Sequence, residues 1–210
     1  MKIIIFGSTG TIGKHLVEQS LEKGYEVTAF SRNKESLSQF SHPNLKKIEG
    51  DVFNVNDCQH AINGQDVVII VLGSGKNRKS IVRSEGTKNI IAAMKMSGVR
   101  RLICQSTLGV GESKGNLNFF WKYIMFGWFL KQVFLDHELQ EEYVRNSELD
   151  WTIVRPAAFT DGEKTGIYKH GFNATDKSLK LKIARADVAD FILKQLDTSI
   201  EPFKSPGLSY

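Results

Sequence analysis

The fold of this chain is decided by one stretch near the start of its sequence, Lys2-Ile3-Ile4-Ile5-Phe6-Gly7-Ser8-Thr9-Gly10-Thr11-Ile12-Gly13-Lys14. Lys2 to Phe6 is a short run of mostly branched apolar residues, which predicts a strand buried on both faces. Three glycines follow at once, and a helical pattern begins at Lys14. Glycines at this spacing permit a tight turn, a close approach of backbone to a pyrophosphate, and close packing of a helix on a strand.

The same turn predicts a dinucleotide-binding site. The N-terminus of the following helix would present free N–H groups and the positive end of its dipole to phosphates. The alternative is a glycine-rich turn between strand and helix that binds nothing. On the binding interpretation, the residues of the turn that contact the cofactor are Gly7, Ser8, Thr9, Gly10, Thr11, Ile12 and Gly13.

Strand and helix patterns alternate along the rest of the chain. Further strands are predicted at residues 25–30, 45–52, 65–72, 101–106, 150–156 and 179–183, and helices at 57–62, 81–97, 136–142 and 185–193. This alternation predicts an α/β fold: a single Rossmann-like, doubly wound, mostly parallel sheet of six or more strands with helices on both faces. We expect one domain over residues 1–210, with a substrate region built from about 107–135 and 157–180.

Composition narrows the class of protein. The 210 residues are 41% hydrophobic and 24% charged, as in ordinary globular chains, and the net charge of +5 suits an anionic cofactor without arguing for nucleic acid. Two cysteines, Cys58 and Cys104, suggest neither a disulfide framework nor a metal site. With no predicted signal peptide and no predicted membrane span, we expect a cytoplasmic monomer or homodimer.

Ligands of doubly wound sheets bind beyond the carboxyl ends of the strands. The glycine turn, Arg32, Asp51, Gly73 and the pair Ser106-Thr107 are all predicted to lie at that edge. NAD sites carry an acidic residue about 20 positions beyond the glycine motif, whereas here the tip of the second strand carries Arg32. Because a guanidinium pairs with a 2′-phosphate, the sequence favours NADP(H) over NAD(H); the alternative is a solvated loop arginine.

Residues 117–135 hold an unusual concentration of aromatic side chains: Phe119, Phe120, Trp121, Tyr123, Phe126, Trp128, Phe129 and Phe134. The stretch is too short for a membrane span and is interrupted by Lys122 and Lys131. Three interpretations stay open: a core helix, an aromatic lid over a flat ligand, or a patch that meets a second copy or a membrane surface.

The chain resembles the atypical short-chain dehydrogenases/reductases, and within them the NADPH-dependent flavin reductase/biliverdin-IXβ reductase group and the NmrA-like proteins. The resemblance covers nearly the whole chain. It rests on residues 7–13, Ser31-Arg32, residues 49–52, 71–73 and 84–90, Asp136-His137, and residues 155–157.

The resemblance implies which residues hold the cofactor. Asp51 and Val52 would contact the adenosine, and Arg32 the 2′-phosphate. A second arginine of the family falls at Ser36 here, so Lys34 would share that contact. The ribose and nicotinamide side would be lined by Leu72, Gly73, Ser74, Ser106, Thr107, Pro156 and Ala157.

Two departures from the family pattern bear on the chemistry. Thr107 stands where the family has a serine near the nicotinamide, and keeps the hydroxyl. Ala157 replaces the histidine of the biliverdin reductase, which weakens the case for tetrapyrrole reduction. In addition, no tyrosine here has a lysine four residues further on, so oxidation of an alcohol through a tyrosine–lysine pair is not expected.

These observations predict an NADPH-dependent reductase that transfers hydride to a flat acceptor, a flavin or a quinone, for which stacking matters more than acid–base catalysis. The acceptor would stack over Ser106-Thr107 beneath the aromatic stretch. Thr107, as a hydrogen-bonding group, and His137, as an orienting group or proton relay, are the candidate catalytic residues; for His137 the alternative is a surface or capping role. The alternative function is an NADP-binding redox sensor without turnover, of the NmrA-like type.

Overall fold

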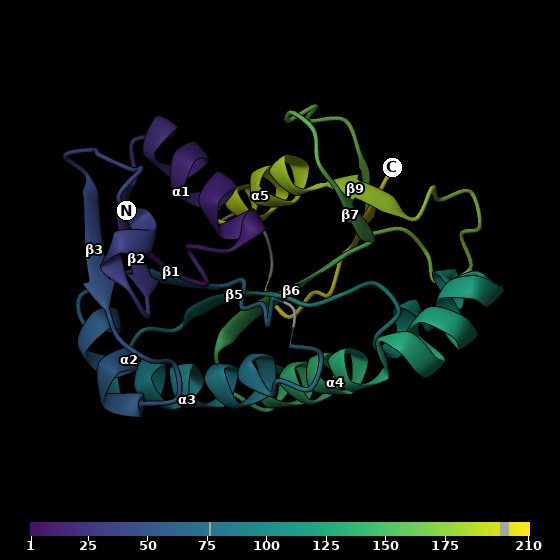
Figure 1. Ribbon diagram of the computed structural model, residues 1–210, viewed down its shortest axis with the longest axis horizontal. Coiled ribbons are helices and arrows are strands. Elements are labelled where there is room, and N and C mark those ends of the chain that lie inside the picture. The colour runs from purple at the N-terminus through teal and green to yellow at the C-terminus, as the bar shows by residue number, and fades with distance from the viewer. Residues whose placement is uncertain (76, 198–201) are drawn as a thin grey trace.

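The computed structural model describes residues 1–75, 77–197 and 202–210. A central sheet lies between two layers of helices (Figure 1). One face is covered by α1 (Thr11–Glu22) and α5 (Arg185–Lys194), and the other by α2 (Val55–Ile62), α3 (Val82–Ser97) and α4 (Lys131–Arg145). The predicted α/β class, with helices on both faces of a sheet, is confirmed.

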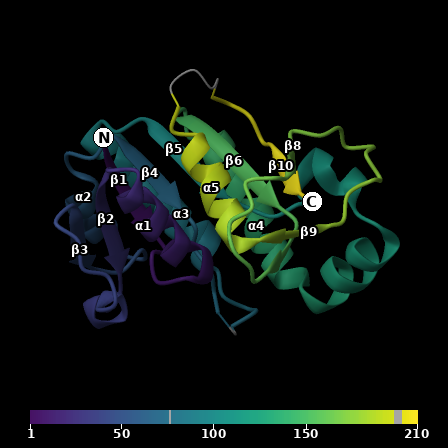
Figure 2. The same ribbon diagram turned by 90° about the horizontal axis from the view of Figure 1, so that it is seen from above.

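Within the described residues, the main sheet has eight strands in the order β3-β2-β1-β4-β5-β6-β10-β8, which can be followed across Figure 2. Only the edge strand β8 is antiparallel to its neighbour. The Rossmann-like, mostly parallel sheet predicted from the sequence is therefore confirmed. Its strands are β1 (Lys2–Phe6), β2 (Glu26–Ser31), β3 (Leu45–Glu49), β4 (Val67–Ile70), β5 (Arg101–Gln105), β6 (Asp150–Pro156), β8 (Lys169–His170) and β10 (Gly207–Ser209).

Smaller elements lie outside this sheet. They are the parallel pair β7 (Ala158–Thr160) and β9 (Lys182–Ala184), the 3₁₀-helices η1 (Lys34–Leu37) and η2 (Gly111–Asn116), and the π-helix η3 (Phe120–Phe129). The strand predicted at 179–183 is wrong in its start. Leu181 adopts a φ of +53°, which interrupts extended backbone, so the strand begins only at Lys182.

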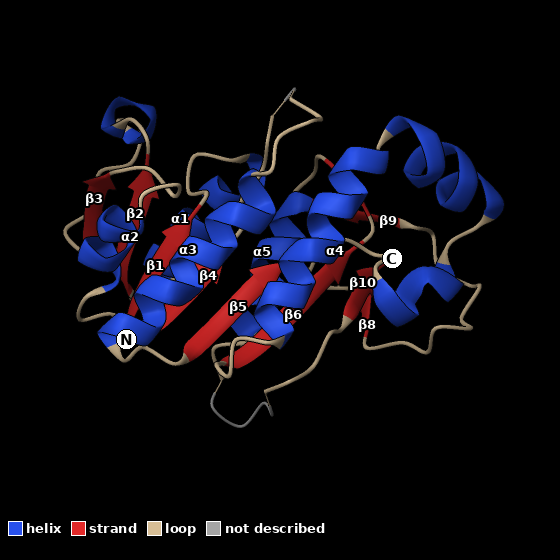
Figure 3. Ribbon diagram, turned by 90° about the horizontal axis from the view of Figure 1, so that it is seen from below, coloured by secondary structure: helices blue, strands red, loops and turns tan. Residues whose placement is uncertain are grey.

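The alternating side chains of β1 explain the two helical layers. Ile3 and Ile5 belong to the core under α1 and α5, whereas Ile4 and Phe6 belong to the core over α2 and α3. All four side chains are fully buried. A strand that is apolar on both faces must be covered on both faces, and Figure 3 shows the helices lying along the strands that they cover.

The aromatic stretch is not a core helix, so that interpretation is wrong for η3. No residue of Phe120–Phe129 is buried, and Trp128 is 75% exposed. Only Trp121 and Phe126 turn inward to pack against the core. The physical reason is that both faces of the sheet are already covered by the other helices.

The junction of β1 and α1 generates a stability prediction. A Cβ atom at Gly13 would collide with the carbonyl group of Gly7, so Gly13→Ala should destabilise the fold by about 1–3 kcal/mol in urea unfolding, as over-packed sites do. Gly127→Ala is the control, because its Cβ would meet only Lys122 O at an ordinary 3.5 Å. Equal stability of wild type and Gly13→Ala would contradict the close packing described here.

Candidate functional site

A cavity of about 650 Å³ lies over the carboxyl ends of the central strands. Its wall follows the strand order: Arg32 lies beyond β2, Gly7 beyond β1, Gly73 beyond β4 and Gln105 at the end of β5. From β2 to β5 is three strand spacings, or about 14 Å, which makes an elongated track. Twelve predicted cofactor or catalytic residues lie on this wall: Gly7, Thr9, Gly10, Thr11, Ile12, Arg32, Asp51, Val52, Leu72, Gly73, Ser74 and His137.

The glycine turn brings the start of α1 to the middle of this wall. Gly7 has a φ of +93°, and a Cβ there would lie 2.5 Å from Val71 O. The N-cap of α1 is Gly10, which supplies no side-chain hydrogen bond, and the first turn of the helix carries no acid. By contrast, α2 is capped by the side chain of Asn54. The first N–H groups of α1 are therefore left for an anion in the cavity, which fits a pyrophosphate.

The end of the cavity beyond β2 and β3 is shaped by backbone contacts. The Asp57 carboxylate accepts a hydrogen bond from Asp51 N at 3.0 Å, and Asn89 Nδ2 donates to Val52 O at 3.0 Å. Among the described residues, the Arg32 guanidinium has no hydrogen bond or ion pair, so it is available to a ligand. Lys34 is exposed and lies outside the wall.

His137 lies on the wall as a buried, neutral imidazole. Its Nδ1 is 3.1 Å from Gln140 Oε1, and Gln140 Nε2 donates to Thr87 Oγ1 at 3.0 Å. With the amide oxygen facing the ring, the matching tautomer of His137 has its hydrogen on Nδ1 and leaves Nε2 as an acceptor. Burial, with a smaller effect from Arg83, lowers the pKa of His137 to about 3, against the opposing effect of the Gln140 hydrogen bond.

Asp136, the neighbour of His137, has a structural role. Its carboxylate accepts hydrogen bonds from Arg83 N at 3.3 Å, Ser84 N at 3.0 Å and Ser84 Oγ at 2.5 Å. Two of these donors are backbone N–H groups of the first turn of α3, so a side chain of α4 caps α3. Arg83 pairs with the same carboxylate at 3.5 Å and donates to Ser74 Oγ at 3.2 Å. The cap thus joins two helices to the wall of the cavity.

Seven predicted site residues do not lie on the wall: Ser8, Gly13, Lys34, Ser106, Thr107, Pro156 and Ala157. The Ser8 hydroxyl donates to Phe30 O at 2.8 Å, deep in the turn. The Ser106 hydroxyl is buried without a hydrogen-bond partner among the described residues. Thr107 is half-buried, with its hydroxyl 3.5 Å from Leu108 O. A contact from Thr107 to a ligand therefore stays a prediction.

Sequence reasoning missed several wall residues. Gln105 is the last residue of β5, one position before the predicted Ser106, and its amide donates to Ser106 O. Its place at a strand end was a usable signal. Phe159 in β7 and Arg83 in α3 had no such signal, because they reach the wall through tertiary packing. No residue of 117–135 is on the wall, so an aromatic lid over this cavity is not observed.

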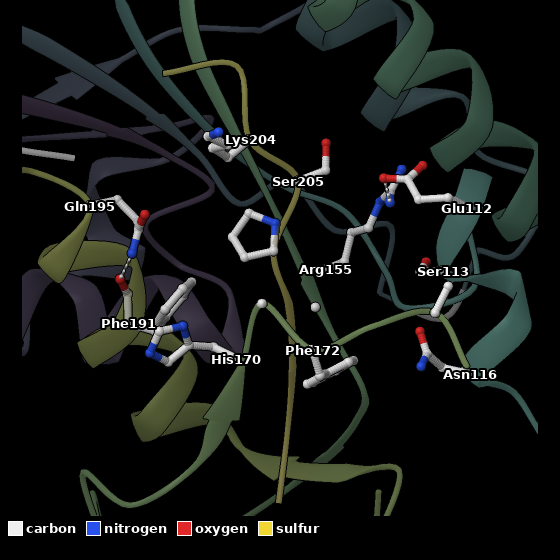
Figure 4. Close-up of a pocket in the computed structure, with 14 residues that line it drawn as sticks. Glu112, Ser113, Asn116, Arg155, His170, Phe172, Phe191, Gln195, Lys204 and Ser205 are labelled. Carbon is white, nitrogen blue, oxygen red and sulfur yellow. Dashed lines mark hydrogen bonds and ion pairs between the residues drawn. The ribbon is translucent and has the colours of Figure 1, made fainter. Parts of the chain in front are cut away.

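A second cavity, of about 480 Å³, lies beside β10 at the other end of the sheet (Figure 4). It is lined in part by both ranges predicted as the substrate region, for example by Asn116 and Phe172, but shares no residue with the first cavity. The guanidinium of Arg155 donates to Glu141 at 2.9 and 2.6 Å and lies 2.7 Å from the Glu112 carboxylate. Its charge is already compensated, so the first cavity is the better candidate for an anionic cofactor.

Two further features of the described residues bear on the site. The described residues contain no helix with the length and apolar character that crossing a bilayer requires. Cys58 and Cys104 are both free and buried, and burial raises the pKa of the Cys58 thiol to about 12. Neither thiol lines the cavity.

Comparisons with known proteins agree with this geometry. A family model described as NAD(P)H-binding matches residues 7–199. UPF0659 protein YMR090W of Saccharomyces cerevisiae is 27% identical over 207 residues, which cover 93% of this chain and 87% of that protein. A 3-beta-hydroxysteroid dehydrogenase of Mycolicibacterium neoaurum is 33% identical over 114 residues, 49% of this chain. That match spans only 31% of the enzyme's own length.

Solved structures are similar over the whole chain. The oxidoreductase ylbE of Lactococcus lactis has a TM-score of 0.84 and 27% identity, covering 100% of this chain and 90% of that one. ChuY, an anaerobilin reductase of Escherichia coli O157:H7, has a TM-score of 0.84 and 22% identity, and the match covers 100% of this chain and 97% of that one. A short-chain dehydrogenase/reductase of Veillonella parvula, solved in complex with NADP, has a TM-score of 0.84 and 19% identity, and the match covers 100% of this chain and 94% of that one. The last two are under 25% identical and show the fold alone, and that fold agrees with the resemblance to the short-chain dehydrogenases/reductases.

The neutral His137 generates a prediction about pH. In the unfolded chain an imidazole binds a proton below about pH 6.5, whereas His137 in the folded protein stays neutral down to about pH 3. The unfolded state therefore binds more protons in this window, and stability falls as the pH falls. Between about pH 7 and pH 5, this one group should cost about 2 kcal/mol of unfolding free energy.

Urea unfolding of wild type and His137→Gln at the two pH values measures this difference. We expect His137→Gln to lose less stability on acidification than wild type. His60→Gln, at an exposed position of α2, is the matched control and should keep the wild-type pH dependence. An identical pH dependence in His137→Gln and wild type would show that His137 is not held neutral.

Proposed function

We propose that this chain, which belongs to the NAD(P)H-binding family, is an NADPH-dependent reductase that passes hydride to a flat acceptor such as a flavin or a quinone. The observation that carries the proposal is the make-up of the cavity wall. Among the described residues, one side of the wall has the uncapped N-terminus of α1 and the unpaired Arg32. The other side has no tyrosine and only a neutral histidine.

The wall fits a phosphorylated dinucleotide in three places. The uncapped start of α1 would bind the pyrophosphate through backbone N–H groups. Asp51 and Val52 would contact the adenosine, and Arg32 would bind a 2′-phosphate in a charge-assisted hydrogen bond. Leu72, Gly73 and Ser74 would line the ribose and the nicotinamide; a Cβ at Gly73 would meet no protein atom within 4 Å, so the backbone there is open to the cavity.

A reduced nicotinamide supplies a hydride when bound, and the residues of this chain would set the position of the two rings. His137 Nε2 would accept a hydrogen bond from an amide N–H of the nicotinamide or of the acceptor. Phe159, in part exposed on the wall, would give the acceptor an apolar face to stack on. Gln105 would close the wall beneath them. Thr107 would contact the bound rings only if its hydroxyl turned towards them.

The lack of a tyrosine among the described residues of the wall supports one class of acceptor. A ketone needs a proton at oxygen as hydride arrives, and short-chain dehydrogenases supply it from a tyrosine. A flavin or a quinone accepts hydride into a conjugated ring and can take its proton from water. Holding two flat rings in parallel is by itself a large rate effect. The acceptor is therefore proposed to be one that needs positioning and no acid from the protein.

ChuY supports the wider class, because its name describes an anaerobilin reductase. Ala157 stands where the biliverdin reductase has a histidine, which speaks against tetrapyrrole reduction here, so a flavin or a quinone is preferred. The competing function, an NADP-binding redox sensor without turnover, is favoured by the same lack of a proton donor. An activity assay separates the two.

The cofactor preference can be tested at Arg32. Arg32→Ala should weaken NADPH binding by about tenfold to a hundredfold, the value of a charge-assisted contact, and leave NADH binding unchanged. Calorimetric titration of both cofactors measures this. Lys34→Ala, two residues on and outside the wall, is the control and should have a smaller effect. Equal affinity of the wild type for NADH and NADPH would refute the preference.

Turnover can be tested by following NADPH oxidation with FMN, riboflavin, a benzoquinone and a dichlorophenol dye. If positioning dominates, His137→Ala and Thr107→Ala should each lower kcat by no more than about ten- to thirtyfold. Phe159→Ala should mainly raise KM for the acceptor, whereas Phe203→Ala, an aromatic residue outside the wall, should not. Tight NADPH binding without oxidation by any of the four acceptors would decide for the sensor.

A further inference from the structure

The segment 113–135 combines two unusual properties. It contains three lysines, Lys114, Lys122 and Lys131, and no aspartate or glutamate. It also carries seven of the fifteen large apolar side chains that are exposed among the described residues. We call six of them the aromatic patch: Phe119 (71% exposed), Phe120 (50%), Tyr123 (55%), Ile124 (39%), Trp128 (75%) and Phe129 (51%).

The opposite side of η3 from the aromatic patch is packed against the core of the protein. Trp121 and Phe126 pack on the core, with their rings 5.8 Å apart, and Phe126 lies 4.8 Å from the buried Phe134. Figures 1, 2 and 3 all place η3 at the end of the molecule opposite β3. The patch is therefore the outer face of an anchored element at one end of the protein, and it is accessible to a large flat partner.

Two lysines of the segment, Lys122 and Lys131, lie in or next to η3, close in sequence to the aromatic patch. Lys122 Nζ stands 5.2 Å from the centre of the Tyr123 ring. Lys131 is the first residue of α4, two positions after the end of η3, and is exposed. Lysines beside exposed tryptophan, tyrosine and phenylalanine are the composition of helices that lie in a membrane interface. There the rings enter the headgroup region and the ammonium groups stay with anionic phosphates.

We propose that the aromatic patch docks this protein onto the surface of a lipid bilayer rich in anionic lipids, with η3 lying in the plane of the interface. Charge decides between this partner and a second copy of the chain. A symmetric dimer through the patch would set these lysines against their own copies, with no acid in 113–135 to compensate them, whereas an anionic bilayer is complementary to them. The proposal does not depend on the cofactor or on turnover.

The test is co-sedimentation of the full chain with vesicles of phosphatidylcholine and phosphatidylserine in equal parts, and with vesicles of phosphatidylcholine alone. We expect binding to the mixed vesicles and much weaker binding to the neutral ones. The double variant Phe119→Ser/Trp128→Ser should bind the mixed vesicles at least about tenfold more weakly. Ile167→Ser, which removes an apolar side chain that is 82% exposed outside the segment, should bind as the wild type does.

A second pair of variants tests the charges. Lys122→Gln/Lys131→Gln should weaken binding to the mixed vesicles by about fivefold per lysine removed. Lys23→Gln/Lys46→Gln makes the same change in net charge at exposed positions elsewhere and should have little effect. Equal losses in the two pairs would mean that net charge alone drives binding, and would overturn the docking geometry.

Tryptophan fluorescence gives a measurement that does not depend on the loss of binding. Trp121→Phe/Trp151→Phe leaves Trp128 as the only tryptophan of the three. Its emission should shift to the blue on mixed vesicles and be quenched by brominated lipid, while thermal melting verifies the fold. Unchanged emission, absence of wild-type binding, or a dimer that Trp128→Ser dissociates in place of vesicle binding would each overturn the proposal.

Discussion

The structure depends on the close contact between the start of α1 and the end of β1. Because a side chain at Gly13 would overlap the Gly7 carbonyl, the helix can approach the strand only with glycine there. That approach aims the uncapped N-terminus of α1 over the sheet where β2 and β4 lie on either side of β1. A packing constraint thus creates a free helix N-terminus at a switch point of the sheet, which suits the phosphates of an anionic cofactor.

A second constraint places the other end of the cavity. Asp136 of α4 caps α3, so these two helices are held in register by hydrogen bonds between a carboxylate and backbone N–H groups. The next residue, His137, is carried to the wall by the same turn. Burial beside Arg83 then keeps its ring neutral. The helix cap and the neutral histidine are therefore two results of one arrangement, and a change in the cap would also alter the environment of the ring.

The sequence predicts the features that depend on local chemistry, and fails where tertiary packing decides. The glycine turn, the alternation of strands and helices, and Arg32 at a strand tip could all be recognised from short-range patterns. The strands β8 and β10 could not, since each has only two or three residues and forms by pairing with distant backbone. The cavity wall shows the same limit: Gln105 was missed and Ser106 was chosen, because the direction of a side chain at a strand end depends on the path of the loop that follows.

The aromatic patch and the cavity are joined through one helix. Leu130 N donates to Met125 O at 2.7 Å, and Phe134 N donates to Leu130 O at 2.8 Å, so the backbone hydrogen bonds continue from η3 into α4. His137 lies seven residues after Leu130, about two helical turns further along. The element that carries the aromatic patch is therefore continuous in its backbone hydrogen bonds with the helix that carries Asp136 and His137. Quinones dissolve in bilayers. On the proposed function, a protein bound to a bilayer surface would therefore meet its acceptor at high local concentration. The exposed rings of the aromatic patch would then bring the protein to the acceptor that His137 helps to position.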